Sequence, residues 1–313
     1  MSSPPPSPRL RLSTLSIVVI FLLLPSCAPF SAPSPPRPKP HVLIAPAQFL
    51  VPADYADLCE SLVSSHGFPS ARCAPLTRLD WLRVVPSSPL RKFISADLDP
   101  EESLLWYYEA LERGMSSILS DVAQASPACA CCPPSAPPAP ASVAIVGHSI
   151  GGWVSSSYLT LSPLRTSVSS LVRSPSDALK VTSLTTLGSP MRVAEGGLVD
   201  QTRGLLRKVE EAGRPEGVQV KSVAGDAALE GLPAVVAGLG YWSLTGSLGG
   251  VGDGIVPVEI ADMEGKVAKV VKGCSHAGHL PTPWKVWSDG PSIPLPDVKW
   301  YGDCVEEWVD FVV

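Results

Sequence analysis

Short apolar runs alternate with amphipathic stretches along most of the chain. The run that ends at Ala45 is continuous and stops at a turn signal, a pattern typical of a strand buried on both faces of a parallel sheet. Similar runs predict further strands at residues 70–75, 143–147, 181–187, 218–223 and 267–271. Apolar residues at a spacing near 3.6 predict helices at 54–65, 100–119, 150–161, 197–212 and 303–312. Strands that alternate with helices predict an α/β fold, with a mostly parallel central sheet and helices on both faces.

The first residues have a different composition, typical of a targeting segment. Arg9 and Arg11 precede an apolar run at 15–24, and small residues follow it as far as Phe30. This order predicts a secretory signal peptide, since the run is shorter than the roughly 20 residues that span a bilayer. We therefore expect the chain to enter the secretory pathway.

The stretch after Phe30 is rich in Ser, Ala and Pro, and the chain has no acidic residue before Asp54. Such a composition is typical of a plastid transit segment. Together with the signal peptide, it resembles the bipartite presequence of algae with complex plastids, although simple secretion or retention in the endoplasmic reticulum stays open. We assign residues 1–40 to this tail and 41–313 to one domain.

The distributions of proline and of charged residues also differ between the tail and the domain. Of the 35 prolines of the 313-residue chain, 11 lie in the first 40 residues and six in the 14 residues 127–140, which predicts an exposed insertion at 126–141. The chain has 24 Lys and Arg against 29 Asp and Glu, and the tail holds four of the basic residues and no acid. Without the tail, 20 basic residues face 29 acids, a net charge of −9. Such an acidic domain is a poor partner for nucleic acid.

The eight cysteines do not form a metal-binding pattern. Cys129-Ala-Cys-Cys132 brings three of them together, but no second pair stands elsewhere at zinc spacing. Seven remain after removal of the signal peptide, and a chain of this length does not need a disulfide framework. We expect no metal and no cofactor.

The strongest chemical signal is Gly147-His-Ser-Ile-Gly151, which fits Gly-x-Ser-x-Gly between a predicted strand and a predicted helix. Such a sharp turn forces strained backbone angles on its serine, and the flanking glycines allow the turn to form. The serine hydroxyl then stands at the carboxyl edge of the sheet, and the next amide can stabilise an oxyanion. We predict Ser149 as the nucleophile and the Ile150 amide as one oxyanion donor.

A serine nucleophile needs a base, and on this kind of fold the order is Ser, acid, His. Downstream of Ser149 only His276 and His279 are present, in a loop after the last predicted strand. We assign the base to His276 because it is nearer the strand end, with His279 as the alternative.

Two aspartates compete for the role of the acid. Asp253 lies between two glycines, which let a loop approach the histidine closely. Asp226 is the alternative, since it follows the strand at 218–223 directly. A second oxyanion donor should come from the turn after the first strand, where the Gln48 amide lies.

Several strings together resemble the plant, algal and cyanobacterial α/β-hydrolases described as lipase-like or GPI inositol-deacylase-like. They are Ala47-Gln-Phe-Leu-Val-Pro-Ala-Asp-Tyr55, Gly147-His-Ser-Ile-Gly-Gly-Trp153, Leu187-Gly-Ser-Pro190, Asp200-Gln-Thr-Arg-Gly-Leu-Leu206, Gly252-Asp-Gly-Ile-Val-Pro257 and Trp300-Tyr-Gly302, together with His276. The resemblance spans 42–313 and implies an α/β-hydrolase fold with Ser149, Asp253 and His276 as its triad. The chain departs from it in the Cys/Pro insertion and in Ser275-His-Ala-Gly-His279, which leaves the choice of histidine open.

A Ser-His-Asp triad hydrolyses esters through an acyl-enzyme. Two segments, 191–215 and 232–248, carry apolar residues suited to line or cover an acyl-chain pocket. We therefore expect a serine esterase or lipase whose substrate is a small-molecule lipid ester, with peripheral contact to a membrane left open. A GPI inositol-deacylase-like activity and a non-catalytic binding protein of the same fold remain alternatives.

Overall fold

The computed structural model describes residues 38–84, 95–125, 140–162, 164, 179–194, 200, 202–247, 250–280 and 282–313. The predicted signal peptide, the transit-like tail up to residue 37, and residues 126–139 of the insertion with Cys129–Cys132 lie outside this set. Lys39–Val313 form one unit, and the following description concerns that unit.

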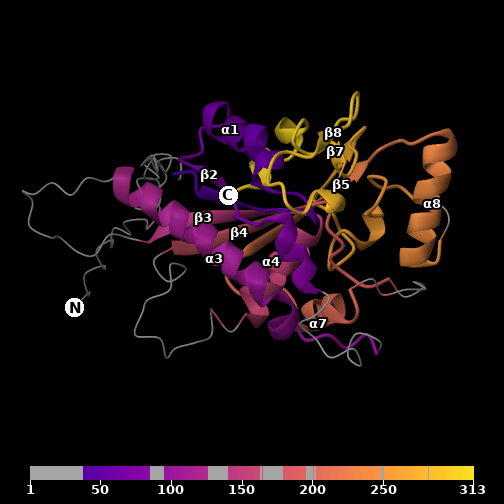
Figure 1. Ribbon diagram of the computed structural model, residues 1–313, viewed down its shortest axis with the longest axis horizontal. Coiled ribbons are helices and arrows are strands. Elements are labelled where there is room, and N and C mark those ends of the chain that lie inside the picture. The colour runs from indigo at the N-terminus through magenta and orange to yellow at the C-terminus, as the bar shows by residue number, and fades with distance from the viewer. Residues whose placement is uncertain are drawn as a thin grey trace, which may run out of the picture. The chain divides into compact units, whose positions relative to one another are not determined.

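A six-stranded sheet forms the centre of the unit, with the order β2-β1-β3-β4-β5-β6 (Figure 1). All five strand pairs are parallel. The strands are β1 His41–Ala45, β2 Ala71–Cys73, β3 Ala141–His148, β4 Leu179–Leu187, β5 Gln219–Asp226 and β6 Lys269–Lys272. A separate antiparallel pair joins β7 His279–Leu280 to β8 Ile293–Pro294. The parallel sheet agrees with the continuous apolar runs of the sequence.

Helices cover both faces of this sheet (Figure 1). Among the described residues, the α-helices are α1 Ala56–Ser64, α3 Pro100–Ala125, α4 Ile150–Leu161, α7 Leu205–Ala212 and α8 Gly231–Thr245. The short 3₁₀ helices in the same part of the chain are η1 Pro52–Tyr55, η2 Arg78–Val84, η3 Val258–Ile260, η4 Pro283–Lys285, η5 Val305–Glu307 and η6 Val309–Phe311. Within the described residues, no helix combines the length and apolar character needed to cross a membrane.

The alternation of strand side chains divides the core into two layers. Leu43 and Ala45 of β1 join a cluster with α3, α4 and α7, whereas Val42 and Ile44 join one with α1 and the C-terminal turns. Successive side chains of a strand point to opposite faces, so each strand contributes to both layers. The predicted fold class is therefore confirmed.

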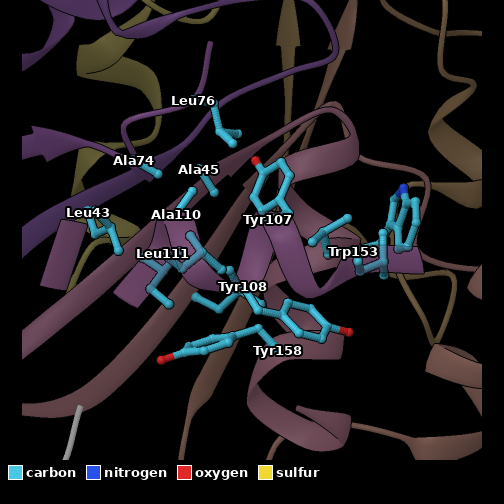
Figure 2. Packing of buried hydrophobic residues seen from close by; sticks show 14 of the residues in the cluster. Leu43, Ala45, Ala74, Leu76, Tyr107, Tyr108, Ala110, Leu111, Trp153 and Tyr158 are labelled. Carbon is cyan, nitrogen blue, oxygen red and sulfur yellow. The ribbon is translucent and has the colours of Figure 1, made fainter. Parts of the chain in front are cut away.

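Helix α3 forms much of the first layer. Asp99 precedes it, and its carboxylate accepts a hydrogen bond of 2.9 Å from the Glu101 amide, which satisfies one of the free amides at the helix start. Figure 2 shows Tyr108 of α3 beside Tyr158 of α4, with the two ring centroids 5.9 Å apart. Burying a large apolar side chain of this kind contributes roughly 1.5–3 kcal/mol. These contacts fix α4, and with it the turn that α4 begins.

Two predicted helices differ in the structure. Residues 303–312 form two 3₁₀ turns, because the chain leaves helical geometry at Trp308, where φ is −137°. The Trp308 indole instead donates a hydrogen bond of 2.8 Å to the Tyr301 carbonyl. The helix predicted at 197–212 begins only at Leu205, because the preceding Arg203 and Gly204 have positive φ of 52° and 93° and form a turn; residues 195–199 and 201 lie outside the described set.

The strand order places the Gly-x-Ser-x-Gly turn after β3, in the middle of the sheet, and the three later strands β4, β5 and β6 run parallel to β3, so their carboxyl ends lie at the same edge. A serine turn at the top of such a sheet, followed in the chain by an acid and a histidine, defines the α/β-hydrolase fold.

Candidate active site

Ser149 occupies a strained turn between β3 and α4. Its φ of 54° and ψ of −126° are rare for a residue with a side chain. The turn requires glycine on its far side, because a Cβ on Gly151 would collide with the backbone carbonyl of Ala45. Gly152 is equally confined, and a Cβ there would meet the Ser189 side chain. The sequence forms this elbow because it leaves both positions without a side chain.

A chain of hydrogen bonds connects Ser149, His276 and Asp253. The Ser149 hydroxyl lies 2.8 Å from His276 Nε2, and His276 Nδ1 lies 2.8 Å from Asp253 Oδ2. A carboxylate oxygen only accepts, so the proton is on Nδ1 and Nε2 accepts from the serine. This tautomer leaves the basic nitrogen directed at the hydroxyl. The structure thus brings together three residues that lie far apart in the sequence.

Asp253 is fully buried and held by several donors. Its Oδ1 accepts from the amides of Ile255 at 3.1 Å and Val256 at 2.8 Å, and its Oδ2 also accepts from the Tyr301 hydroxyl at 2.9 Å. Burial acts to raise the pKa of Asp253, but the charge of His276 and these hydrogen bonds outweigh burial, so the pKa lies below its usual value. The carboxylate stays ionised beside the histidine.

Neither alternative residue joins this chain of hydrogen bonds. Asp226 ends β5, and its Oδ1 accepts instead from the Ala228 amide at 3.1 Å. The loop at Asp253 lies against Gly225, where an added Cβ would come within 2.8 Å of the Asp253 Cβ. The absence of a side chain at Gly225 therefore lets Asp253 approach. His279 is in β7, with its ring 5.9 Å from that of Trp300, and its Nδ1 has no hydrogen-bond partner among the described residues.

The two predicted oxyanion donors border the same space. Gln48 and Ile150 both line the cavity beside Ser149. In the described part of the chain, neither amide has a hydrogen-bond partner. The turn at Gln48 continues into Phe49, whose φ of 62° reverses the chain. Two free amides beside a serine hydroxyl are suited to bind a developing negative charge.

A cavity of about 270 Å³ lies next to Ser149. Its walls are largely aromatic and aliphatic and include Trp81, Trp106, Tyr107, Trp153, Leu205 and Leu206. Leu244 of α8 also borders it, so both segments that the sequence proposed for an acyl pocket contribute. An apolar cavity with a few polar groups at one end is the usual form of a small-molecule site.

Comparisons with known proteins identify no family for this chain. No protein-family model and no curated protein matches it. Among solved structures, the mature form of the lipase BlEst2 from Bacillus licheniformis is similar at 12% identity and a TM-score of 0.44, covering 78% of this chain and 88% of its own. The deformylase Nfo from Pseudomonas putida S16 is similar at 14% identity and a TM-score of 0.23, covering 54% of this chain and 46% of its own. These similarities are distant, and the α/β-hydrolase fold is recognised from the strand order and the elbow.

Ser189 supports the elbow, a role that the sequence did not suggest. Its hydroxyl donates to the Ser149 carbonyl and accepts from the Trp153 amide at 3.1 Å. It therefore ties the end of β4 to the first turn of α4. The only sequence signal for it was its place in Leu187-Gly-Ser-Pro190, which carried no predicted role.

Tyr301 is a second supporting residue without a predicted role. Burial, then the charge of Asp253, raises its pKa well above the usual value, so the hydroxyl remains protonated and donates to the carboxylate. Tyr301 therefore helps to hold Asp253 Oδ2, the same oxygen that accepts from His276 Nδ1. Ser189 bonds to Ser149 and Tyr301 bonds to Asp253, so two of the three central residues are held in place by the surrounding fold.

Proposed function

We propose that this protein is a serine hydrolase that cleaves carboxylic esters of lipids through an acyl-enzyme. The observation that supports it most is the hydrogen-bonded chain from Ser149 through His276 to Asp253, with distances of 2.8 Å at both links. The strained elbow and the two free amides provide the remaining parts that acyl transfer needs.

In the proposed reaction, His276 Nε2 takes the proton of the Ser149 hydroxyl as the oxygen attacks the ester carbonyl. Asp253 holds the histidine in the correct tautomer and stabilises the imidazolium. The amides of Gln48 and Ile150 bind the oxyanion of the tetrahedral intermediate. His276 then gives its proton to the departing alcohol, and an acyl group stays on Ser149. A water molecule, activated by the same histidine, hydrolyses this ester.

The substrate class follows from the cavity. Its aromatic and aliphatic walls suit an acyl chain, and the Ser149 hydroxyl lies at its border. An ester whose acyl group enters this cavity has its carbonyl beside the nucleophile. We therefore propose lipid acyl esters as substrates. A GPI inositol-deacylase-like reaction would use the same acyl chemistry, and only the resemblance of the sequence favours it.

A fluorophosphonate probe tests the enzymatic proposal directly. We expect the wild-type protein to be labelled and Ser149→Ala to lose labelling. Ser155→Ala is the matched control, because Ser155 is a buried serine of α4 whose hydroxyl has no hydrogen-bond partner among the described residues. A folded wild-type protein that resists the probe would show that the fold is non-catalytic here. Labelling that persists in Ser149→Ala would place the nucleophile elsewhere.

A second experiment separates the two histidines and the two substrate classes. His276→Ala should abolish hydrolysis of a short-chain p-nitrophenyl ester, whereas His279→Ala should retain it. A panel of acylglycerols and an acylated inositol phospholipid then distinguishes a lipase from a GPI inositol-deacylase-like enzyme. Hydrolysis of the acylated inositol alone would contradict the broader lipid-ester assignment.

A further inference from the structure

A second chain of hydrogen bonds runs behind the candidate triad and involves two residues that the reaction does not use. It joins the Ala47 amide, the Tyr55 hydroxyl, the His148 ring and the His276 carbonyl. The three links measure 2.8, 2.8 and 2.7 Å. Tyr55 and His148 are each 1% exposed, so water does not compete for these bonds.

The direction of each bond is fixed by the groups at its ends. A carbonyl only accepts, so His148 Nε2 carries the proton that it donates to the His276 carbonyl. A backbone amide only donates, so the Tyr55 oxygen accepts from Ala47. The Tyr55 hydroxyl proton is then free to point at His148 Nδ1. Neutral His148, protonated on Nε2, bonds both neighbours and also gives the Tyr55 hydroxyl proton an acceptor, whereas a proton on Nδ1 would leave that hydroxyl proton without one.

The surroundings keep His148 in this neutral form. Burial first, and then the nearby charge of His276, lowers its pKa from 6.5 to about 3. The two imidazole centroids are only 5.2 Å apart. When His276 accepts the proton of Ser149, a neutral neighbour adds no like charge to the site.

The second series of hydrogen bonds connects three parts of the candidate active site: the turn at Gln48, the elbow at Ser149 and the loop at His276. Ala47 directly precedes the candidate oxyanion donor Gln48, and His148 directly precedes Ser149. His276 lies in a loop outside any helix or strand, and its amide donates to the Asp253 carbonyl at 2.8 Å. With His148 on its carbonyl, both backbone groups of His276 are held. The elbow is thus tied to the oxyanion turn on one side and to the base on the other.

We propose that Tyr55 and His148 are positioning residues, which hold the Gln48 turn and the His276 loop at fixed places relative to Ser149. This inference rests on the proposed hydrolase function for its effect on rate. A displacement of about 1 Å in such a site can lower the rate by roughly 100-fold.

Substitutions of His148 test the link to His276. Replacing His148 by Leu removes both hydrogen bonds, and we expect kcat for a p-nitrophenyl ester to fall on the order of 100-fold with little change in KM. His148→Gln places an amide N–H near the former Nε2 and should recover most of kcat. His148→Asn places its polar atoms near the former Nδ1 and should recover little. A Gln variant as slow as the Leu variant, at equal urea-unfolding midpoints, would overturn the proposal.

Tyr55→Phe tests the other half of the chain and has a matched control. We expect kcat to fall on the order of tenfold, because one buried hydroxyl serves two partners. Tyr108→Phe is the control, since Tyr108 is also fully buried and its hydroxyl bonds Ser157 at 2.6 Å, away from the site. Adding Tyr55→Phe to His148→Leu should lower kcat no further, because His148→Leu has already interrupted the series of hydrogen bonds that joins Ala47 to His276. Equal losses of kcat in Tyr55→Phe and Tyr108→Phe, or additive losses in the double variant, would refute the proposed positioning role.

A spectroscopic measurement tests the positioning role of His148 separately from the proposed enzymatic function. The His276 Nδ1 proton that binds Asp253 gives a downfield proton resonance in NMR spectra. We expect it to be retained in His148→Gln and shifted or lost in His148→Leu. If the wild type resists the fluorophosphonate probe, the proposed function is wrong. The resonance still shows whether His148 positions His276. A resonance unchanged in His148→Leu would contradict the positioning role.

Discussion

At the scale of single residues, Ser149 and Asp253 each hold a position that is unfavourable for their residue type. Ser149 has a positive φ of 54°, and Asp253 is an ionised carboxylate with an exposed fraction of 2%. Strain and desolvation of this kind persist only where the surrounding structure enforces them. Gly151 and Ser189 enforce the first, and Tyr301 with two backbone amides enforces the second.

Replacing Asp253 by Asn should inactivate the protein without unfolding it. The amide keeps the size of the side chain, but it can donate to His276 Nδ1 and so favours the wrong tautomer. A loss in kcat of about 10⁴-fold is the usual result when the acid of a Ser-His-Asp triad is changed in this way. Steady-state hydrolysis of a p-nitrophenyl ester measures it, with Asp226→Asn as the control. If Asp226→Asn gave the larger loss, Asp226 would be the acid.

His148 should make the folded protein sensitive to acid. Its pKa is about 3 in the fold, lowered by burial and His276 from 6.5, so below pH 6.5 the unfolded chain binds a proton that the folded chain refuses. The contribution of His148 to the free energy of unfolding is complete above pH 6.5 and falls by about 1.4 kcal/mol per pH unit between pH 6.5 and pH 3. From pH 7 to pH 5 the wild type should lose about 2 kcal/mol more than His148→Gln. Urea unfolding at both pH values measures this, and equal losses would show that His148 is charged or exposed.

At the scale of elements, a buried ion pair fastens the C-terminal loop to the start of the domain. Arg78 and Asp54 have fully buried side chains, with 3.8 Å between Nη2 and Oδ2. The Arg78 guanidinium donates to the carbonyls of Ser288 and Gly290, and Asp54 accepts from the Ser292 amide. Residues 288–292 contain no helix or strand, so these bonds fix the path of the chain there.

Asp54→Ala should therefore destabilise the fold strongly. Removing one partner leaves the Arg78 charge buried and unpaired, which costs about 3–5 kcal/mol of unfolding free energy. Adding Arg78→Met should recover part of this loss, because no uncompensated charge remains. The matched control is Asp57→Ala, since Asp57 is an exposed acid of α1. Urea unfolding measures all three variants, and a loss in Asp54→Ala no larger than that of the control would contradict the argument.

The elements also show why parts of the fold were readable from the sequence. The strands were predicted within a few residues because buried parallel strands are continuous apolar runs. The elbow was readable because only glycine fits beside its serine. The turns at 303–312 were not predicted, since an apolar spacing near 3.6 says nothing about the hydrogen bond from the Trp308 indole to the Tyr301 carbonyl. The roles of Tyr55, His148 and Tyr301 were equally hidden, because each depends on contacts between segments far apart in the chain.

At the scale of the whole molecule, the N-terminal tail differs in composition from the rest of the chain. The tail is basic and rich in proline, whereas the rest of the chain carries the acids. Every part of the candidate site lies within Lys39–Val313. We therefore propose that residues 1–40 determine where the protein is delivered and contribute no group to the reaction.

Delivery can be tested on the tail alone, fused to a fluorescent protein in an alga with a complex plastid. The whole tail should direct the fusion into the plastid, because an apolar signal sequence precedes an acid-free, Ser-rich stretch. Removing residues 15–24 should leave the fusion in the cytosol, since the apolar run is the part that enters the secretory pathway. Phe30→Ala should divert the fusion to secretion if the aromatic residue at the expected cleavage site marks the transit segment. Secretion of the unaltered fusion would show that the tail is a simple signal peptide, and a cytosolic fusion would refute both assignments.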